Sequence, residues 1–263
     1  MTPSRPPVAL TIAGSDSGGG AGVQADLKTF LDLGVYGCSA LTALTAQNTV
    51  GVFAVHPAPV AIVQEQISRV LEDLQPDAIK IGMLATAALV RAVTDSLVGY
   101  SGAVVLDPVM VATSGDRLLD ADAVAALREL LLPRCTLATP NLPELDVLGG
   151  WAWLARAPVP VLVKGGHAPD GPVLDRLVWP GGAERVWSHP RVQSRNTHGT
   201  GCTLSSAIAA LLARGQGLEQ AVGGGLDYVA ALVQGSAAHT LGAGHGPLLH
   251  GLVSSPNARS RDT

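Results

Sequence analysis

Residues 8–20 read VALTIAGSDSGGG, and this stretch decides the fold class of the chain. Val8–Ala13 is a continuous apolar run with the length of a strand that is buried on both faces. After the glycine-rich loop, Val23, Leu27 and Phe30 recur at helical spacing, which predicts a helix from about residue 21 to residue 33. A buried strand, a short loop and a helix form the repeating unit of a parallel α/β sheet.

The same alternation continues along the rest of the chain. We expect further strands at residues 38–46, 78–81, 103–106, 136–139 and 159–164, and helices at residues 59–74, 84–97, 120–132, 200–213 and 218–234. Residues 173–188 predict a hairpin that turns on Pro180-Gly181-Gly182. We therefore predict a three-layer α/β/α fold with a mostly parallel central sheet.

Composition excludes several other classes of protein. The 263 residues are 47% apolar, 14% charged and only 3% aromatic, with 31 glycines and 18 prolines. This length allows a sizeable buried core, and the composition excludes fibrous, disulfide-scaffold and disordered proteins. With no internal repeat or linker, we expect a single domain over residues 1–263, flexible at residues 1–7 and from about 252 to 263. One glycine cluster, residues 223–225, falls inside the last expected helix without a functional explanation.

Charge and cysteine content indicate which partners and which cellular compartment to expect. The net charge is −4 and no basic run occurs, so neither nucleic acid nor a membrane surface is expected as a partner. Cys38, Cys135 and Cys202 are far apart and lack metal-ligand spacing, which favours a reducing compartment. We see no signal peptide and no apolar run long enough to span a membrane, so we expect a cytoplasmic protein.

The loop at residues 14–22, GSDSGGGAG, predicts a close approach between backbone and ligand. It fails the phosphate-loop pattern because Gly20 stands where a lysine is required. It also fails the dinucleotide pattern because Val23 replaces the last glycine, so a nicotinamide enzyme is not expected. A plain strand-to-helix connection would seldom need so many glycines.

The second glycine turn, Gly199-Thr200-Gly201-Cys202, precedes the expected helix at 200–213. Backbone N–H groups and the helix dipole would form an anion hole for a phosphoryl group or an oxyanion. Cys202 lies at the helix start, where its thiolate is favoured, so it is a candidate base or nucleophile. The alternative is a small apolar cysteine in a helix cap. His198 is expected to be a helix-entry residue rather than a base.

Charged groups follow other strand ends. Glu144 and Asp107 are candidates to hold Mg²⁺ on nucleotide phosphates, and Lys164 is a candidate phosphate ligand. The alternative for Asn141-x-Pro143-Glu144 is an ordinary helix start, with asparagine as the cap.

Several segments together resemble the hydroxymethylpyrimidine/phosphomethylpyrimidine kinases of thiamin biosynthesis, within the ribokinase-like superfamily. The segments occur in family order and span nearly the whole chain. They are residues 9–30, 43–52 (ALTAQNTVGV), 80–84 (KIGML), 104–119, 139–144 (TPNLPE), 163–167 (VKGGH) and 195–213 (RNTHGTGCTLSSAIAALLA). The resemblance implies a ribokinase-like fold, with ATP as co-substrate and Mg²⁺ as cofactor. It also implies phosphorylation of 4-amino-5-hydroxymethyl-2-methylpyrimidine and then of its monophosphate.

The resemblance also implies roles for individual residues. On the pyrimidine side it implies contacts from Gln47, Asp26, Met83, Gly14 and Gly20. It places Cys202 next to the reacting hydroxyl and makes the turn Gly199–Cys202 the anion hole.

On the other side of the site, the resemblance assigns metal and phosphate contacts to Glu144 and Asp107. It assigns nucleotide contacts to Lys164 and Asn141, and it implies a homodimer.

The segment between Glu144 and Lys164 is shorter than is usual in this family by roughly one helix. Trp151 and Trp153 fall in it and are expected to cover the sheet surface left open. Two alternatives to the main function remain: a pyridoxal or pyridoxine kinase, and a catalytically silent pyrimidine-binding protein. A thiazole-alcohol kinase is disfavoured because it lacks the N-terminal glycine loop and the TAQN segment.

Overall fold

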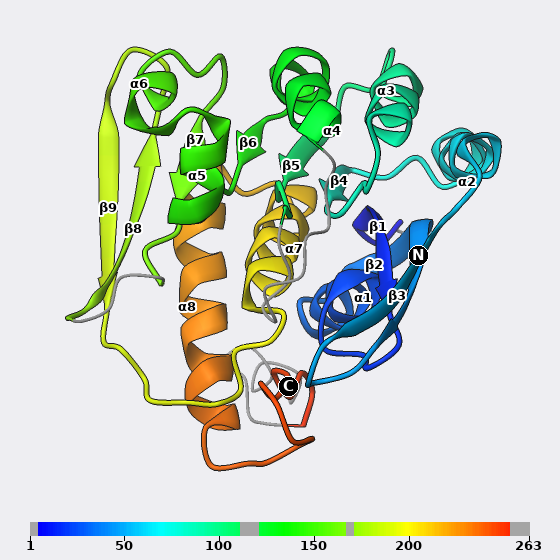
Figure 1. Cartoon of the computed structure of the whole chain (residues 1–263). Helices are drawn as coiled ribbons and strands as arrows, with labels where there is room; N and C mark the ends of the chain where they lie inside the picture. Colours follow the sequence, from blue (N-terminus) through cyan, green and yellow to red (C-terminus); the bar gives the residue numbers. More distant parts are fainter. Residues whose placement is uncertain (1–4, 111–120, 167–170, 253–263) are drawn as a thin grey trace.

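The computed structural model describes residues 5–110, 121–166 and 171–252, and these residues form one nine-stranded sheet (Figure 1). The strand order is β3-β2-β1-β4-β5-β6-β7-β8-β9. The central pairs from β2 to β7 are parallel, and β3, β8 and β9 run antiparallel to their neighbours. The strands are β1 Val8–Asp16, β2 Tyr36–Gln47, β3 Val52–Pro57, β4 Ala78–Ile81, β5 Ala103–Leu106, β6 Leu137–Ala138, β7 Val161–Val163, β8 Val173–Val178 and β9 Glu184–His189.

Helices cover both faces of this sheet, which confirms the predicted three-layer fold. One face carries α1 (Gly22–Asp32), α7 (Thr200–Ala213) and α8 (Leu218–Ser236). The other carries α2 (Val60–Asp73), α3 (Ala87–Ser96), α4 (Ala121–Ala126), α5 (Leu142–Leu148) and α6 (Gly150–Leu154). Side chains of β1 alternate between the two cores: Leu10 and Ile12 pack with α2 and α3, whereas Ala9 packs with α1 and α7.

The glycine cluster in α8 has a packing role. A Cβ on Gly224 would lie 2.9 Å from Leu211 Cδ1, and one on Gly225 would lie 2.9 Å from Ile208 Cγ1. Both neighbours belong to α7, so the missing side chains let the two helices approach closely. These glycines therefore support the helix pair at whose start the candidate anion hole lies.

Three parts of the chain differ from the sequence prediction. Strand β3 was not expected, and the helix expected at 120–132 is α4 followed by a π turn (Leu127–Leu131) and a 3₁₀ turn (Leu132–Arg134). The shortened segment still forms two short helices, α5 and α6. Trp153 packs against the core on that face, as expected, whereas Trp151 is 55% exposed and covers no sheet surface.

The chain ends are described only in part. Arg5 pairs with Asp77 at 2.9 Å, which ties the entry to β1 onto the end of α2. Residues 1–4 and 253–263, and Val111 to Leu119 of the family-like segment 104–119, lie outside the described residues. No helix of the described part of the chain is long and apolar enough to cross a membrane.

Candidate active site

A cavity of about 680 Å³ opens where the parallel strands end. The carboxyl ends of parallel strands meet at one edge of a sheet, so residues far apart in sequence converge there. Most of the predicted site residues line this cavity: Gly14, Gln47, Met83, Asp107, Asn141, Glu144, Lys164, Gly199, Thr200, Gly201 and Cys202. Asp26 and Gly20 are the two that do not.

Asp16 organises the glycine-rich loop after β1. Its carboxylate accepts backbone hydrogen bonds from Gly18 (2.8 Å), Gly20 (3.0 Å) and Ala21 (2.9 Å). His198 Nε2 lies 2.8 Å from Asp16 Oδ2, so the same carboxylate joins the loop to the entry of α7. Burial favours the neutral acid, but the hydrogen bonds from His198 and from the backbone lower the pKa of Asp16. Sequence reasoning gave Asp16 no role, although an acidic residue within a glycine loop was a usable signal.

Gly20 has a different role from the one expected. A Cβ at this position would lie 2.5 Å from His198 Cδ2 and 2.9 Å from Pro247 Cβ. The missing side chain therefore allows the two glycine loops to pack together, and Gly20 does not lie on the cavity wall. His198 lies at the entry to α7, as expected, and its contact with Asp16 joins the two loops.

The turn Gly199–Cys202 forms the centre of the cavity wall. Gly199 adopts φ +81°, a left-handed conformation that favours glycine, and it is the N-cap of α7. The Cα of Gly201 faces the charged group, because a Cβ there would lie 3.2 Å from Lys164 Nζ and 3.3 Å from Asp107 Oδ2. The free N–H groups of the first turn of α7 thus lie beside a lysine, as in a site for phosphate.

The prediction of a favoured Cys202 thiolate is wrong for this structure. Burial raises the pKa of Cys202 to about 11, although the positive charge of Lys80 and a hydrogen bond from the Gly22 backbone act in the opposite direction. The helix N-terminus is a local effect, whereas the burial that raises this pKa depends on how α7 packs against α1 and β4. Cys202 is therefore a thiol at neutral pH in the ligand-free site.

Asp107, Lys164 and Glu144 form a charged group at the ends of β5, β7 and the start of α5. Lys164 Nζ lies 2.7 Å from Asp107 Oδ1 and 3.8 Å from Glu144 Oε2. Burial raises the pKa of Glu144 to about 7; Lys164 opposes this rise and Asp107 adds to it. Asn141 and Glu144 also form a capping box, with reciprocal hydrogen bonds of 2.8 and 2.9 Å. The capping box confirms the helix-start interpretation. Both residues also line the cavity, and their metal and nucleotide contacts remain predictions.

Asp26 does not face the cavity, contrary to the expectation. It is fully buried, and its oxygens lie 2.8 and 3.0 Å from Lys80 Nζ. Lys80 itself lines the cavity, so the acidic residue lies one layer behind the wall. Sequence reasoning missed Lys80: a charged residue inside the apolar strand 78–81 was the signal.

Comparisons with known proteins agree with this geometry. The sequence profile of the family described as phosphomethylpyrimidine kinase matches residues 16–249. The hydroxymethylpyrimidine/phosphomethylpyrimidine kinase of Bacillus subtilis is 43% identical over 256 residues, covering 92% of this chain and 94% of that protein. The protein of the same name from Rhizobium meliloti is 47% identical over 266 residues, covering 92% and 96%. This chain belongs to the phosphomethylpyrimidine kinase family.

Solved structures with the same fold include two kinds of vitamin kinase. An ADP complex of Bacillus subtilis pyridoxal kinase superposes with a TM-score of 0.84 at 32% identity, covering 93% of this chain and 97% of that one. The phosphomethylpyrimidine kinase of Clostridium difficile 630 superposes with a TM-score of 0.72 at 40% identity, covering 85% and 97%. The ribokinase-like fold predicted from the sequence is thereby confirmed.

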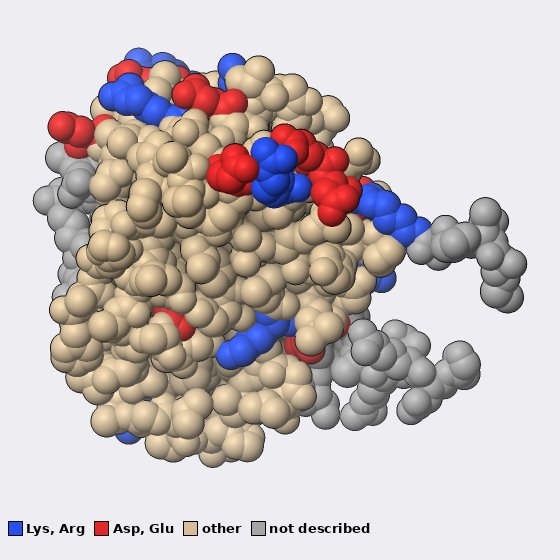
Figure 2. Space-filling view, turned by 90° about the vertical axis from the view of Figure 1, so that its right-hand side faces the viewer, with Lys and Arg blue, Asp and Glu red and all other residues tan. Residues whose placement is uncertain are grey.

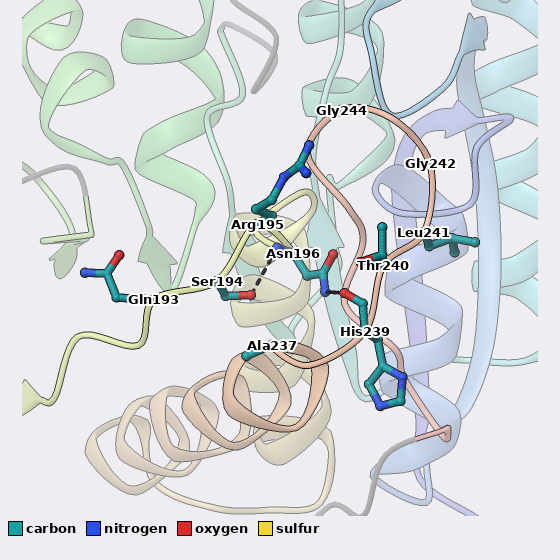
Figure 3. Close-up of a pocket in the computed structure, with 10 residues that line it drawn as sticks. All are labelled: Gln193, Ser194, Arg195, Asn196, Ala237, His239, Thr240, Leu241, Gly242 and Gly244. Carbon is teal, nitrogen blue, oxygen red and sulfur yellow. Dashed lines mark hydrogen bonds between the residues drawn. The ribbon is translucent and has the colours of Figure 1, made fainter.

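A second cavity of about 320 Å³ is lined by residues 193–196, which precede the anion-hole turn, and by residues of the segment 237–244 (Figure 3). Figure 3 shows Arg195 and Asn196 lying beside this loop. Asn196 donates hydrogen bonds to the carbonyls of Ser236 and His239, so both protons of its amide are used. The hydrogen bonds of Asn196 hold the C-terminal loop against the entry to α7, and the pocket lies beside this contact.

Proposed function

We propose that this chain transfers the γ-phosphoryl group of ATP to 4-amino-5-hydroxymethyl-2-methylpyrimidine and then phosphorylates the resulting monophosphate. The observation that carries the proposal is the position of the Gly199–Cys202 turn. It lies in one cavity with Gln47, Met83 and Gly14 and with the Asp107, Lys164 and Glu144 group. Phosphoryl transfer depends mainly on such positioning and charge stabilisation.

The acceptor side of the cavity suits an aminopyrimidine. The amide of Gln47 lines the cavity at the end of β2, and it offers both a donor and an acceptor to a ring edge. Met83 supplies an apolar wall, and Gly14 leaves room beside it, since a Cβ there would lie 3.4 Å from Met83 Sδ. We assign pyrimidine binding to these three residues.

The donor side suits nucleotide phosphates. We assign phosphate contacts to Lys164 and to the N–H groups of the Gly199–Cys202 turn, and nucleotide contacts to Asn141. Asp107 and Glu144 would hold Mg²⁺, which neutralises phosphate charge when bound. Mg²⁺ in kinases is held by one or two carboxylates together with phosphates and water, and these two carboxylates fit that pattern. No cluster of three His, Cys, Asp or Glu suited to a metal occurs among the described residues.

Cys202 is assigned to the reacting hydroxyl. As a thiol it can hydrogen-bond this hydroxyl and orient it toward the phosphoryl group. To accept the hydroxyl proton it must first ionise, and this requires a positive charge nearby.

The main function and its alternative differ in the molecule that accepts the phosphoryl group. The alternative needs testing because pyridoxal kinases are among the solved structures with this fold. One coupled assay of ATP consumption tests both, with hydroxymethylpyrimidine, its monophosphate, pyridoxal and the thiazole alcohol compared at equal concentration. We expect turnover with the first two. Turnover with pyridoxal alone would overturn the proposal, and no magnesium-dependent turnover with any acceptor would indicate a silent binding protein.

We also propose a cytoplasmic homodimer. All three cysteines are free thiols, as expected in a reducing compartment. The β2–β3 edge exposes apolar side chains, including Tyr36 (56%), Leu44 (53%) and Phe53 (70%). On this side of the molecule most charged side chains lie in the upper part, and the wide area below them holds only a few (Figure 2). Light scattering on the wild type and on Phe53→Lys tests the dimer: the wild type should be dimeric and the variant monomeric.

A further inference from the structure

The pair Asp26–Lys80 is completely buried, and every hydrogen-bond partner of its carboxylate comes from a different element. Asp26 Oδ1 accepts from Lys80 (3.0 Å) and from Ser206 (2.7 Å). Asp26 Oδ2 accepts from Lys80 (2.8 Å) and from Thr11 (2.6 Å). The pair thus joins β1, α1, β4 and α7 at one point inside the molecule.

Stability alone does not explain this pair. Removing two charges from water costs several kcal/mol per ion, and replacing a buried pair by apolar residues is often neutral or stabilising. The four joined elements are the ones whose ends bring Gly14, Gly22, Met83 and Cys202 to the cavity. The position of the pair therefore indicates a role in the site.

Lys80 is the member of the pair that reaches the cavity wall. A Cβ on Gly82 would lie 2.8 Å from Lys80 Nζ, so the glycine two residues later leaves space for the ammonium. Two of the three ammonium protons point to Asp26, which fixes the direction of the side chain. Asp26 Oδ1 accepts from both Lys80 and Ser206, and Ser206 lies one helical turn after Cys202 on α7. The ammonium is therefore held beside the start of α7, which carries Cys202.

We propose that Lys80 is a positioning residue for phosphoryl transfer, whose ammonium, held by Asp26, is the fixed positive charge that stabilises the thiolate of Cys202. The inference rests on the proposed function. Cys202 first loses its thiol proton to solvent, and the thiolate then takes the proton of the substrate hydroxyl while the hydroxyl oxygen bonds to the γ-phosphorus. The bond from that phosphorus to the β–γ bridging oxygen breaks, ADP leaves, and Cys202 is a thiol again.

The charges around the pair support this role. Burial alone would lower the pKa of Lys80, but Asp26, Cys202 and Asp107 together hold it above its ordinary value, so the lysine stays charged. For Cys202, burial is the largest effect and raises the pKa, and Lys80 is the strongest influence in the opposite direction. The charges of Asp26 and Asp107 are weaker and raise the pKa. A fixed charge in a site of low dielectric acts without reorganisation during the reaction.

The competing explanation is a mechanical one. Ser206 lies one helical turn after Cys202, so Asp26 would serve only to dock α7 against β1. The two explanations differ in which member of the cluster matters: the charge of Lys80, or the hydrogen bond to Ser206.

The test compares Lys80→Met combined with Asp26→Asn against the wild type. The double variant removes both charges while keeping similar volumes, so no uncompensated buried charge is left, whereas Lys80→Met alone risks misfolding. Circular dichroism confirms the fold. We expect kcat to fall about 30-fold while the KM for the pyrimidine changes by less than about threefold.

Alkylation of Cys202 by iodoacetamide at pH 8 provides a readout that needs no substrate. Cys38 and Cys135 are buried, and mass spectrometry identifies the modified residue. We expect alkylation of Cys202 to be about tenfold slower in the double variant, because less thiolate forms. If the wild type phosphorylates only pyridoxal, the proposed function fails while the alkylation result still tests the role of Lys80.

Ser206→Ala is the matched control, because it cuts the link to α7 and keeps both charges. We expect its kcat and its alkylation rate to stay within about threefold of the wild type. Equal losses in Ser206→Ala and the double variant would overturn the proposal in favour of docking. Unchanged alkylation in the double variant would overturn it as well.

Discussion

Two lysine–carboxylate groups serve the same cavity, and they differ in how fully their polar atoms are used. In the closed group, each oxygen of Asp26 accepts two hydrogen bonds, and the donors are Lys80, Thr11 and Ser206. All four residues are 0% exposed. In the open group, Lys164 bonds Asp107 at 2.7 Å but stays 3.8 Å from Glu144. Burial and the negative charge of Asp107 raise the pKa of Glu144, which favours its neutral form.

The difference separates two uses of buried charge. A saturated group holds its geometry and presents a constant field, whereas an unsaturated group gains stability when a cation or phosphate arrives. We therefore expect ligand-dependent behaviour from the open group and ligand-independent behaviour from the closed one.

The largest effect is expected from Asp107→Asn. This change removes the partner of Lys164 and one proposed magnesium ligand, so kcat should fall by about 10³-fold at saturating Mg²⁺. Steady-state kinetics measure it. Asp32→Asn is the control, because Asp32 bonds Tyr228 and the backbone of Gly251 outside the cavity, and it should keep wild-type kcat. Equal kcat in the two variants would mean that the open group does not act in catalysis.

Cys202→Ser should have the next largest effect. The serine keeps a hydrogen bond to the substrate hydroxyl but ionises far less readily, so kcat should fall by about 10²-fold. The KM for the pyrimidine should change little, since the ring contacts are untouched. Comparable turnover in the variant would exclude a base role for Cys202 and leave it as an orienting group.

Sequence patterns predicted the elements that depend on local residue spacing and missed those that depend on contacts with distant parts of the chain. Strands 78–81 and 103–106 were predicted with their observed bounds because each is a short run that is buried except for Ala103. Strand β3 was missed because its side chains are largely exposed at the sheet edge, so it exists through pairing with β2 rather than through an apolar pattern.

The site shows the same limit residue by residue. The strand-end residues Asp107 and Lys164 were found because parallel topology places strand ends together. Asp26 was placed wrongly because its face of α1 is decided by Lys80, 54 residues away. The thiol state of Cys202 depends on packing from α1 and β4, which no local motif reports.

Glu144→Gln should change the pH dependence of stability. The pKa of Glu144 is raised from 4.5 to about 7, so the folded chain binds a proton more tightly than the unfolded chain. Its contribution to stability is full below about pH 4.5 and is lost as the pH rises through about 7. From pH 5 to pH 8 the Tm of Glu144→Gln should therefore rise relative to wild type by a few degrees, roughly as one to two kcal/mol would produce.

Differential scanning fluorimetry measures this difference in Tm. The same measurement with and without Mg²⁺ tests whether Glu144 takes part in ligand binding. At pH 8, Mg²⁺ with a nonhydrolysable ATP analogue should raise the Tm of the wild type more than that of Glu144→Gln. Parallel Tm curves for the two proteins across the whole pH range would show that Glu144 titrates as an ordinary surface carboxyl.

Thr11→Val should give the smallest change in activity and confine its effect to stability. The valine keeps the shape of the threonine but removes the hydroxyl that bonds Asp26 Oδ2 at 2.6 Å. One carboxylate lone pair is then unsatisfied in the core, which should cost about 1–2 kcal/mol of unfolding free energy. Urea titration measures this loss, and kcat should stay within about twofold because Lys80 keeps its charge and its partner. A large fall in kcat with Thr11→Val would show that the closed group is not rigid, because loss of one peripheral hydrogen bond would then have moved the ammonium.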